Sequence, residues 1–195
     1  MKVTREKAAE NRERIILTAA RLFREKGFDG IGVADLMKSA GLTHGGFYGH
    51  FASKTELAAT ACDSALVKSR EKWATIAEAG GGEALEKMAR SYLSEAHRDK
   101  PGSGCALAAL GPDAARQDAA IKRSLTDGLK GLVEILEKVL DADSEAARHE
   151  AALAVMAEMV GAVMLSRMVD DEDMSKAILE AATRDLIARD RAKSA

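Results

Sequence analysis

Apolar side chains return every three or four residues along most of this chain, a spacing that places them on one face of an α-helix. The clearest such stripe runs through Leu85, Met88, Tyr92 and Ala96. Only two prolines interrupt the 195 residues, and no segment alternates apolar and polar residues as a half-buried strand does. The sequence therefore predicts an all-α fold of about nine helices.

Glycine, proline and capping residues mark where these helices begin and end. Gly27 is placed to end the first helix in the left-handed conformation, and Thr43 is placed to cap the third. Leu42 and Phe47 occupy hydrophobic-staple positions around that cap, and Ser53–Glu56 forms a capping box. The expected helices span residues 7–26, 33–40, 44–50, 53–79, 83–98, 105–110, 112–140, 144–169 and 173–191.

Composition restricts the class of protein. Apolar residues make up 47% of the chain and charged residues 31%, which is typical of soluble globular proteins. The formal net charge is −2, yet residues 1–57 hold ten Lys and Arg against seven Asp and Glu. This asymmetry favours the N-terminal part for any nucleic-acid surface, although an excess this small is also ordinary scatter.

The cysteines and the N-terminus indicate a compartment. Cys62 and Cys105 are the only cysteines, and their wide separation favours a reducing compartment over a disulfide framework or a zinc site. The first residues are charged and lack the apolar core of a secretion signal, and we find no run of about 18 apolar residues that could span a membrane. We expect a cytoplasmic protein without metal, cofactor or membrane partner.

The first 57 residues have the proportions of a helix-turn-helix, with three short helical segments of which the last two are joined at residues 39–42. A helix that enters a DNA major groove about 12 Å wide needs small or hydrogen-bonding residues on its exposed side. Thr43, His44, Gly45 and Gly46 at the start of the third segment satisfy this need. The two glycines either allow the DNA to approach the backbone or allow tight helix packing.

Three stretches carry a resemblance to a known family. Residues 14–28 contain Ala19-Ala20-x-Leu22-Phe23, residues 40–51 run from Ala40-Gly41 to Phe47-Tyr48-x-His50-Phe51, and residues 53–57 read Ser-Lys-Thr-Glu-Leu. In this order and at these separations, they resemble the TetR family of transcriptional repressors. The resemblance covers about residues 7–60, and the rest of the chain matches in its expected architecture more than in sequence.

The resemblance implies an all-helical homodimer that binds a palindromic operator on double-stranded DNA and releases it when a small-molecule effector binds. A three-helix DNA-binding domain would span residues 1–55, and a larger effector-binding and dimerisation domain residues 56–195. By position, Lys54 would hold a phosphate. Many family members have Thr or Ser where Gly32 stands, so a hydroxyl contact at that point is in doubt. The residues expected at the DNA are Thr43, His44, Gly45, Gly46, Tyr48 and His50.

The larger domain must be interpreted from its physical pattern. Apolar residues on the helices expected at 53–79, 83–98 and 112–140 can line a shared interior for the effector, where the Tyr92 hydroxyl would orient it. The same residues can also be ordinary core. The candidate effector-binding residues are Trp73, Met88, Tyr92, Cys105 and Leu107.

Cys105 has a second interpretation of its own. It follows Gly102-Ser103-Gly104 and begins a short expected helix, where backbone amides favour a thiolate. This placement is typical of a thiol that senses electrophiles or oxidants, whereas the simpler alternative is a small buried apolar residue.

The helix expected at 144–169 is apolar almost all round between residues 151 and 165, so both of its faces need to be covered. One face can pack inside its own subunit and the other against a second copy, which together with the last helix gives a four-helix interface. The expected interface residues are Ala147, Ala151, Ala154, Gly161, Leu165, Ile178 and Ala182.

The main competing class is an all-helical enzyme or small-molecule carrier with a vestigial helix-turn-helix. The sequence contains no phosphate-binding glycine loop, no nucleophile elbow, and no paired carboxylates with a histidine at metal-ligand spacing. We therefore predict a regulator without catalytic residues, and as an alternative mechanism of release a thiol switch at Cys105.

Overall fold

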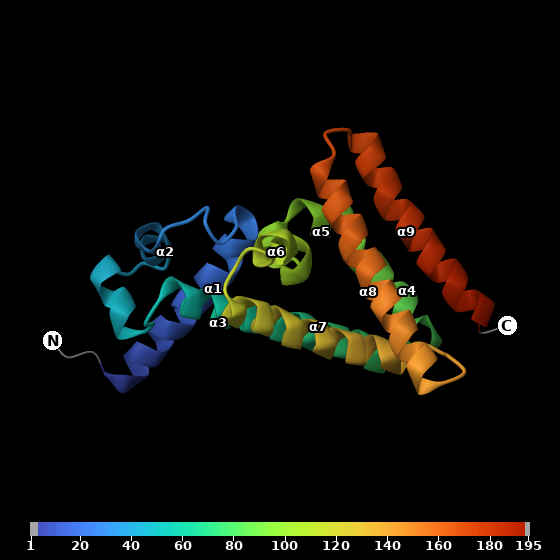
Figure 1. Cartoon of the computed structure of the whole chain (residues 1–195), viewed down its shortest axis with the longest axis horizontal. Coiled ribbons are helices and arrows are strands. Elements are labelled where there is room, and N and C mark those ends of the chain that lie inside the picture. The colour runs from blue at the N-terminus through green and yellow to red at the C-terminus, as the bar shows by residue number, and fades with distance from the viewer. Residues whose placement is uncertain (1–3, 194–195) are drawn as a thin grey trace. The chain divides into compact units, whose positions relative to one another are not determined.

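The computed structural model describes the backbone of residues 4–193 and the side chains of residues 4–190, and it is helical throughout this part of the chain (Figure 1). Nine α-helices and three short 3₁₀ helices occur there without a strand, which confirms the all-α prediction. The elements are α1 (Arg5–Lys26), α2 (Val33–Ser39), η1 (His44–Gly49), α3 (Lys54–Gly80), η2 (Gly81–Glu83), α4 (Ala84–Tyr92), α5 (Glu95–Asp99), η3 (Pro101–Ser103), α6 (Ala106–Ala114), α7 (Ala119–Val139), α8 (Glu145–Met168) and α9 (Glu172–Lys193).

The helices form two compact units, which we describe separately. Unit 1 contains the chain up to Val67 together with Pro101–Asp127, and unit 2 contains Lys68–Lys100 together with the chain from Gly128 onward. Both α3 and α7 therefore contribute residues to each unit. The predicted functional boundary at residue 55 is a different kind of division and stays a prediction.

The two ends of α1 are fixed by local hydrogen bonds in unit 1. The Thr4 hydroxyl accepts from the Lys7 amide at 3.2 Å, and the Gly27 amide donates to the Phe23 carbonyl at 2.8 Å. Gly27 has a φ of 77° as expected, but its ψ of 169° differs from that of the predicted left-handed cap. The positive φ favours glycine there, and a Cβ would in addition displace the Asp113 carboxylate.

The single helix expected over residues 83–98 is two helices, α4 and α5. Ser94 has an extended backbone, and its hydroxyl accepts from the His97 amide at 3.2 Å, so it caps a new helix. In the sequence the apolar stripe runs across Ser94 to Ala96, although Ala96 is exposed in the structure. The continuous stripe hid the break from the sequence pattern.

The sequence suggested that a new helix begins at Pro112. In the structure Pro112 lies within α6 instead. The missing proline N–H costs one backbone bond near the end of the helix, which α6 tolerates because only two helical residues follow. The break falls after it, where the Arg116 amide donates to the Asp113 carbonyl at 3.0 Å. The next helix, α7, begins at Ala119.

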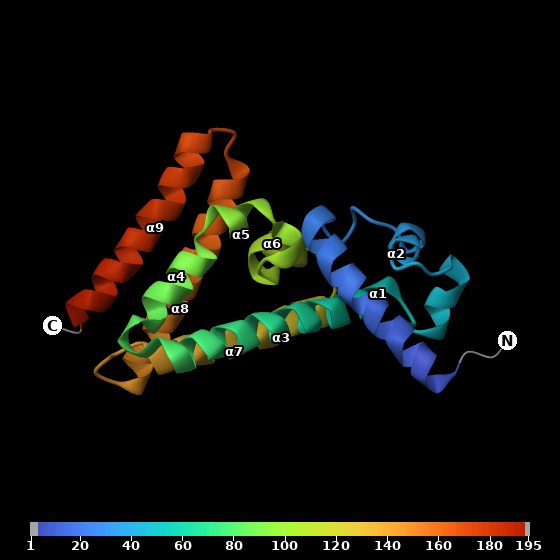
Figure 2. The ribbon, with the colours of Figure 1, turned by 180° about the vertical axis from the view of Figure 1, so that it is seen from behind.

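In unit 2, α8 and α9 lie side by side as an antiparallel pair in both views (Figures 1 and 2). The Ser144 hydroxyl caps α8 by accepting from the Ala147 amide at 3.1 Å, and Ala152, Met159 and Val163 are fully buried. By length and composition α8 could also cross a membrane, contrary to our expectation, with 39% of its most apolar window buried. A core helix of a soluble protein meets the same criterion.

Candidate nucleic-acid interface

The predicted recognition segment, η1, is a 3₁₀ helix and not the α-helix that the sequence suggested. Its bonds are of the tighter kind, with the Gly46 amide donating to the Thr43 carbonyl at 3.0 Å and the His50 amide to the Phe47 carbonyl at 2.9 Å. The Thr43 hydroxyl makes no capping bond, so the predicted side-chain cap is wrong. Three of the six residues are glycines, which disfavour the α-helix, and the segment adopts the 3₁₀ helix instead.

The structure tests the packing explanation for the glycines of η1. None of them has a positive φ, so the backbone conformation does not require glycine. A side chain at Gly45 or Gly49 would meet nothing within 4 Å, and one at Gly46 would make ordinary contacts of 3.6 and 3.7 Å. Tight packing within the described part of the chain therefore does not explain these glycines, and their contact with DNA stays a prediction.

Aromatic rings hold η1 in place. Phe47 is the one buried residue of η1, and its ring lies 5.9 Å from that of Phe51, which is also buried. Tyr48 packs edge-on against Phe47 at 5.2 Å but is 70% exposed. The chain thus buries one ring of this motif and presents the next. Leu42 is half-buried, and its predicted staple contact with Phe47 stays a prediction.

The structure places the predicted DNA-contacting residues on one short segment. Thr43, His44, Gly45, Gly46 and Tyr48 are exposed, and the rings of His44 and Tyr48 lie 6.5 Å apart. His50, at the end of η1, is half-buried. Their contacts with DNA remain predictions, which these exposures support.

The start of α3 follows directly and is fixed by the predicted capping box. The Ser53 hydroxyl accepts from the Glu56 amide at 3.1 Å, and the Glu56 carboxylate accepts from the Ala52 amide at 2.7 Å. Lys54 is the first residue of α3 and is half-buried. The side chain predicted to hold a phosphate therefore stands on a rigid helix end.

Sequence reasoning missed a polar link inside unit 1. The Arg24 guanidinium of α1 donates from Nε at 3.0 Å, and also from Nη2, to the carbonyl oxygen of Gly102 in η3. Burial of this guanidinium lowers the pKa of Arg24. The two residues are 78 positions apart, so no local pattern could have revealed the contact. The link fixes η3, and with it the start of α6, to the first helix.

The candidate effector residues fall in different units. Trp73, Met88 and Tyr92 are buried in unit 2, where the Trp73 and Tyr92 rings meet edge-on at 5.8 Å. Cys105, which is buried, and Leu107, which is half-buried, belong to unit 1. The structure therefore brings Trp73 and Tyr92 together, and whether any of the five binds an effector stays a prediction.

His97 belongs to the same cluster as Trp73 and Tyr92. Its ring packs edge-on against Tyr92 at 4.5 Å, and its Nδ1 lies 2.6 Å from the Tyr92 carbonyl oxygen. Burial lowers the pKa of His97, so the ring is neutral at physiological pH and packs as part of the interior.

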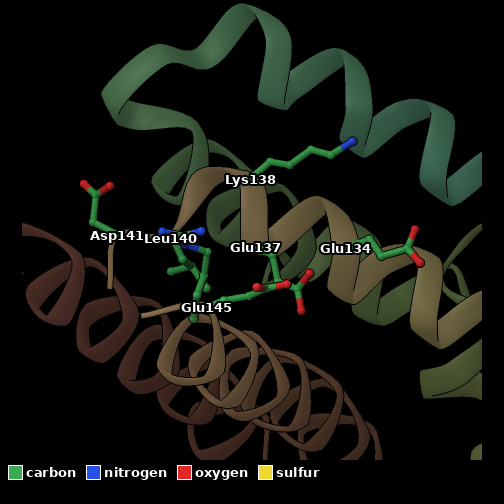
Figure 3. A pocket seen from close by; sticks show the side chains of 7 residues that line it. Glu134, Glu137, Lys138, Leu140, Asp141 and Glu145 are labelled. Carbon is green, nitrogen blue, oxygen red and sulfur yellow. The ribbon is translucent and has the colours of Figure 1, made fainter. Parts of the chain in front are cut away.

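Unit 2 also has an open hollow of about 680 Å³ where α7 ends and α8 begins (Figure 3). Acidic and basic side chains surround it, and Figure 3 shows them around the loop between the two helices. None of the five candidate effector residues lines this hollow. Its lining residues are Glu134, Glu137, Lys138, Leu140, Asp141, Glu145 and Arg148.

The two thiols of unit 1 are both buried. Cys105 immediately precedes α6 and is 5% exposed. Cys62 lies in α3, and burial, together with the nearby Asp63, raises the pKa of its thiol to about 12. Apolar residues, among them Phe23 and Leu110, and Arg24 surround Cys62. The Cys62 thiolate is therefore almost absent at neutral pH.

This pKa predicts slow alkylation of Cys62. In a Cys105→Ser variant at pH 8, only about one Cys62 thiol in 10⁴ is ionised, so iodoacetamide should leave the native protein unlabelled over an hour. The same variant in guanidinium chloride is the control, and it should be alkylated within minutes. Mass spectrometry measures both, and rapid native labelling would contradict this environment for Cys62.

The residues predicted at the dimer interface are all at least partly exposed. Ala147, Ala154 and Leu165 are exposed on α8, and Leu165 retains 48% of its surface. Larger apolar side chains lie exposed on the same two helices, including Met168 at 74% and Met174 at 55%. The half-buried members of the predicted set are Ala151, Gly161, Ile178 and Ala182.

Comparison with known proteins supports the helix-turn-helix. The sequence profile of the bacterial regulatory proteins of the tetR family matches residues 15–61, which contain most of α1, all of α2 and η1, and the start of α3. Over 90 residues the chain is 32% identical to the HTH-type transcriptional regulator YerO of Bacillus subtilis. That alignment covers 46% of this chain and 31% of YerO, so the chain spans about a third of that relative.

Two further proteins extend the likeness to the whole fold. The HTH-type transcriptional repressor NemR of Escherichia coli is 22% identical over 135 residues, 68% of each chain. The crystal structure of reduced NemR has a TM-score of 0.78, at 19% identity, over 91% of this chain and 95% of NemR. A TetR regulator from Chloroflexus aurantiacus has a TM-score of 0.76, at 27% identity, over 93% of this chain and 94% of its own.

These findings agree with the prediction of a regulator that is not an enzyme, since the TetR family acts by binding DNA. The motifs that carry the assignment are the same ones that build η1 and the start of α3. Residues 15–61 thus carry the DNA-binding helix-turn-helix of the tetR family of bacterial regulatory proteins, and the chain has the all-helical fold of TetR-family transcriptional regulators.

Proposed function

We propose that this regulator is a cytoplasmic repressor that binds a palindromic operator as a homodimer and releases it when a small molecule binds. The observation that carries the DNA-binding part is η1, where exposed Thr43, His44 and Tyr48 stand beside glycines that nothing within the chain requires. Glycine at such positions lets a partner approach the backbone closely. The phosphate backbone of DNA, with base edges beside it, is such a partner.

The apolar side chains left uncovered on α8 and α9 support the homodimer. Leu153, Leu165 and Met168 are 43%, 48% and 74% exposed on a helix that already buries its other face. A second copy of the same pair of helices would cover them and form a symmetric, self-complementary interface. The dimer would then present two η1 segments to two half-sites about one helical turn apart.

Release by an effector would act through the elements that belong to unit 1 together with the DNA-binding segment. The carbonyl of Gly102 is held by Arg24 of α1, so a shift of η3 or α6 would also move α1. The buried Trp73–Tyr92 pair is the apolar surface we assign to the effector. Effector binding would favour the conformation with low DNA affinity by its differential affinity for the two states.

The test selects duplexes from a random library with the purified full-length protein. A palindromic consensus is expected, with an affinity for DNA that falls steeply as salt rises because phosphate contacts release counterions. The upstream region of the regulator's own gene should contain a match. The absence of any preference over random DNA at moderate salt would overturn the proposal.

A thiol-controlled release is a second candidate, supported by the place of Cys105 directly before α6, beside the segment held by Arg24. Alkylation of Cys105 would need the start of α6 to open, because the thiol is buried. A Cys105→Ser variant separates the two mechanisms. Unchanged release of the operator by an alkylating reagent in that variant would remove Cys105 from the mechanism.

A further inference from the structure

The N-terminal half of α1 holds an arginine in an unusual setting. Arg12 is half-buried, and its guanidinium carbon lies 4.6 Å from the centre of the Phe51 ring. A guanidinium over an aromatic face at this distance is attracted to the ring, which fixes a side chain that otherwise has many rotamers. Arg12 is therefore positioned before any ligand arrives.

The ring that holds Arg12 belongs to the DNA-binding segment. Phe51 packs on Phe47 at 5.9 Å, and Phe47 is the buried anchor of η1. Three residues after Phe51, Lys54 begins α3. Arg12 is thus fixed to the same aromatic pair that places η1, and that pair directly precedes the start of α3 in the sequence.

No ion pair between described residues neutralises the charge of Arg12. Neighbouring cations of α1 have polar partners, since Lys7 pairs with Glu10 at 2.7 Å and Arg14 bonds to Asn11 at 2.5 Å. Among the ion pairs and hydrogen bonds between described residues, none involves Arg12. A ring face attracts the cation but accepts no in-plane N–H, so the guanidinium keeps donors for an oxyanion.

We infer that Arg12 is a further DNA-binding residue, which holds a backbone phosphate of the duplex alongside η1 and the start of α3. Arg12 contacts the phosphate and not a base edge. It therefore fixes how the DNA-binding domain docks on the duplex and does not select the sequence. This inference rests on DNA binding by the helix-turn-helix domain, but not on the proposed dimer, effector or repression.

The first experiment measures how binding depends on salt. Fluorescence anisotropy with a random-sequence 24-base-pair duplex and with the selected operator should show that Arg12→Gln weakens both to the same degree. The slope of log affinity against log salt should become shallower by about 0.9 per subunit, the value for one lost phosphate contact. Arg12→Lys should keep the wild-type slope because it retains the charge.

The matched control is Arg14→Gln, which removes the same charge two residues along the same helix. Its slope should equal that of the wild type. An equal loss in both variants would mean that bulk charge is responsible, and a lowered Tm with an unchanged slope in Arg12→Gln would mean that Arg12 only packs on Phe51. Either result overturns the inference. Absence of duplex binding by the wild type would instead overturn the proposed function.

A second measurement uses the unaltered protein, so it does not depend on how a variant folds. Phenylglyoxal modifies accessible guanidinium groups, and mass spectrometry locates the modified arginines. Addition of the duplex should protect Arg12 several-fold and leave Arg14 as reactive as before. Equal reactivity of Arg12 with and without the duplex would also overturn the inference.

Discussion

Replacing Phe47 by alanine should lower the free energy of unfolding by about 3–4 kcal/mol and remove measurable operator binding. Phe47 is 1% exposed and is the one side chain of η1 that is buried. Its loss leaves a cavity beside Phe51 and removes the anchor of a segment whose three glycines give it little helical stability of its own. Denaturation in guanidinium chloride and anisotropy with the operator measure the two effects.

Tyr48→Ala is the matched control, since Tyr48 is the next residue and 70% exposed. Its free energy of unfolding should stay within about 0.5 kcal/mol of the wild type, while operator affinity falls at least tenfold. Together, the Phe47→Ala and Tyr48→Ala variants distinguish a residue that holds η1 in place from a residue that contacts DNA. Folded Phe47→Ala protein that binds the operator as tightly as the wild type would show that DNA is read elsewhere.

The second large effect concerns the exposed face of α8 that contains Ala154 and Leu165, which we call the seam. Ala154→Glu should convert the protein into a folded monomer, because a carboxylate would be buried without a partner where two copies meet. Operator affinity should then fall about 100-fold or more, because a single DNA-binding domain loses the effective concentration that the second subunit supplies. Sedimentation equilibrium reports the mass, and anisotropy reports the affinity.

Val67→Glu is the control for adding a charge to an exposed apolar position. Val67 lies on α3 in unit 1 and is 47% exposed, similar to Leu165 on the proposed seam. This variant should remain a dimer with wild-type operator affinity. A dimeric Ala154→Glu protein would place the interface elsewhere, and a monomeric Val67→Glu protein would implicate α3.

Residues close together in the sequence carried most of the correct predictions. The capping box at Ser53–Glu56 needs only neighbours within four positions, and both of its hydrogen bonds are present. The order and spacing of the helix-turn-helix motifs identified the family for the same reason. Helical periodicity likewise predicted the buried face of α4, where Leu85, Met88 and Tyr92 are buried.

The errors arose where two local signals competed. The apolar stripe at residues 83–98 outweighed the capping signal of Ser94, and Pro112 was taken as a helix start although a helix tolerates it near its end. In η1 the pattern suggested an α-helix, whereas glycine content and the anchoring of Phe47 produced a 3₁₀ helix. In each case the alternative local conformations differ little in free energy, and tertiary packing selects one of them.

The sequence by itself determined the all-helical fold and the family resemblance, and it predicted a DNA-binding segment, because period, caps and motif spacing are properties of neighbouring residues. Only the tertiary structure decided that Arg24 holds the Gly102 carbonyl and that the Phe51 ring holds Arg12. It also removed intramolecular packing as the reason for the η1 glycines. These facts join distant positions, and packing brings such residues together without leaving a periodic trace in the chain.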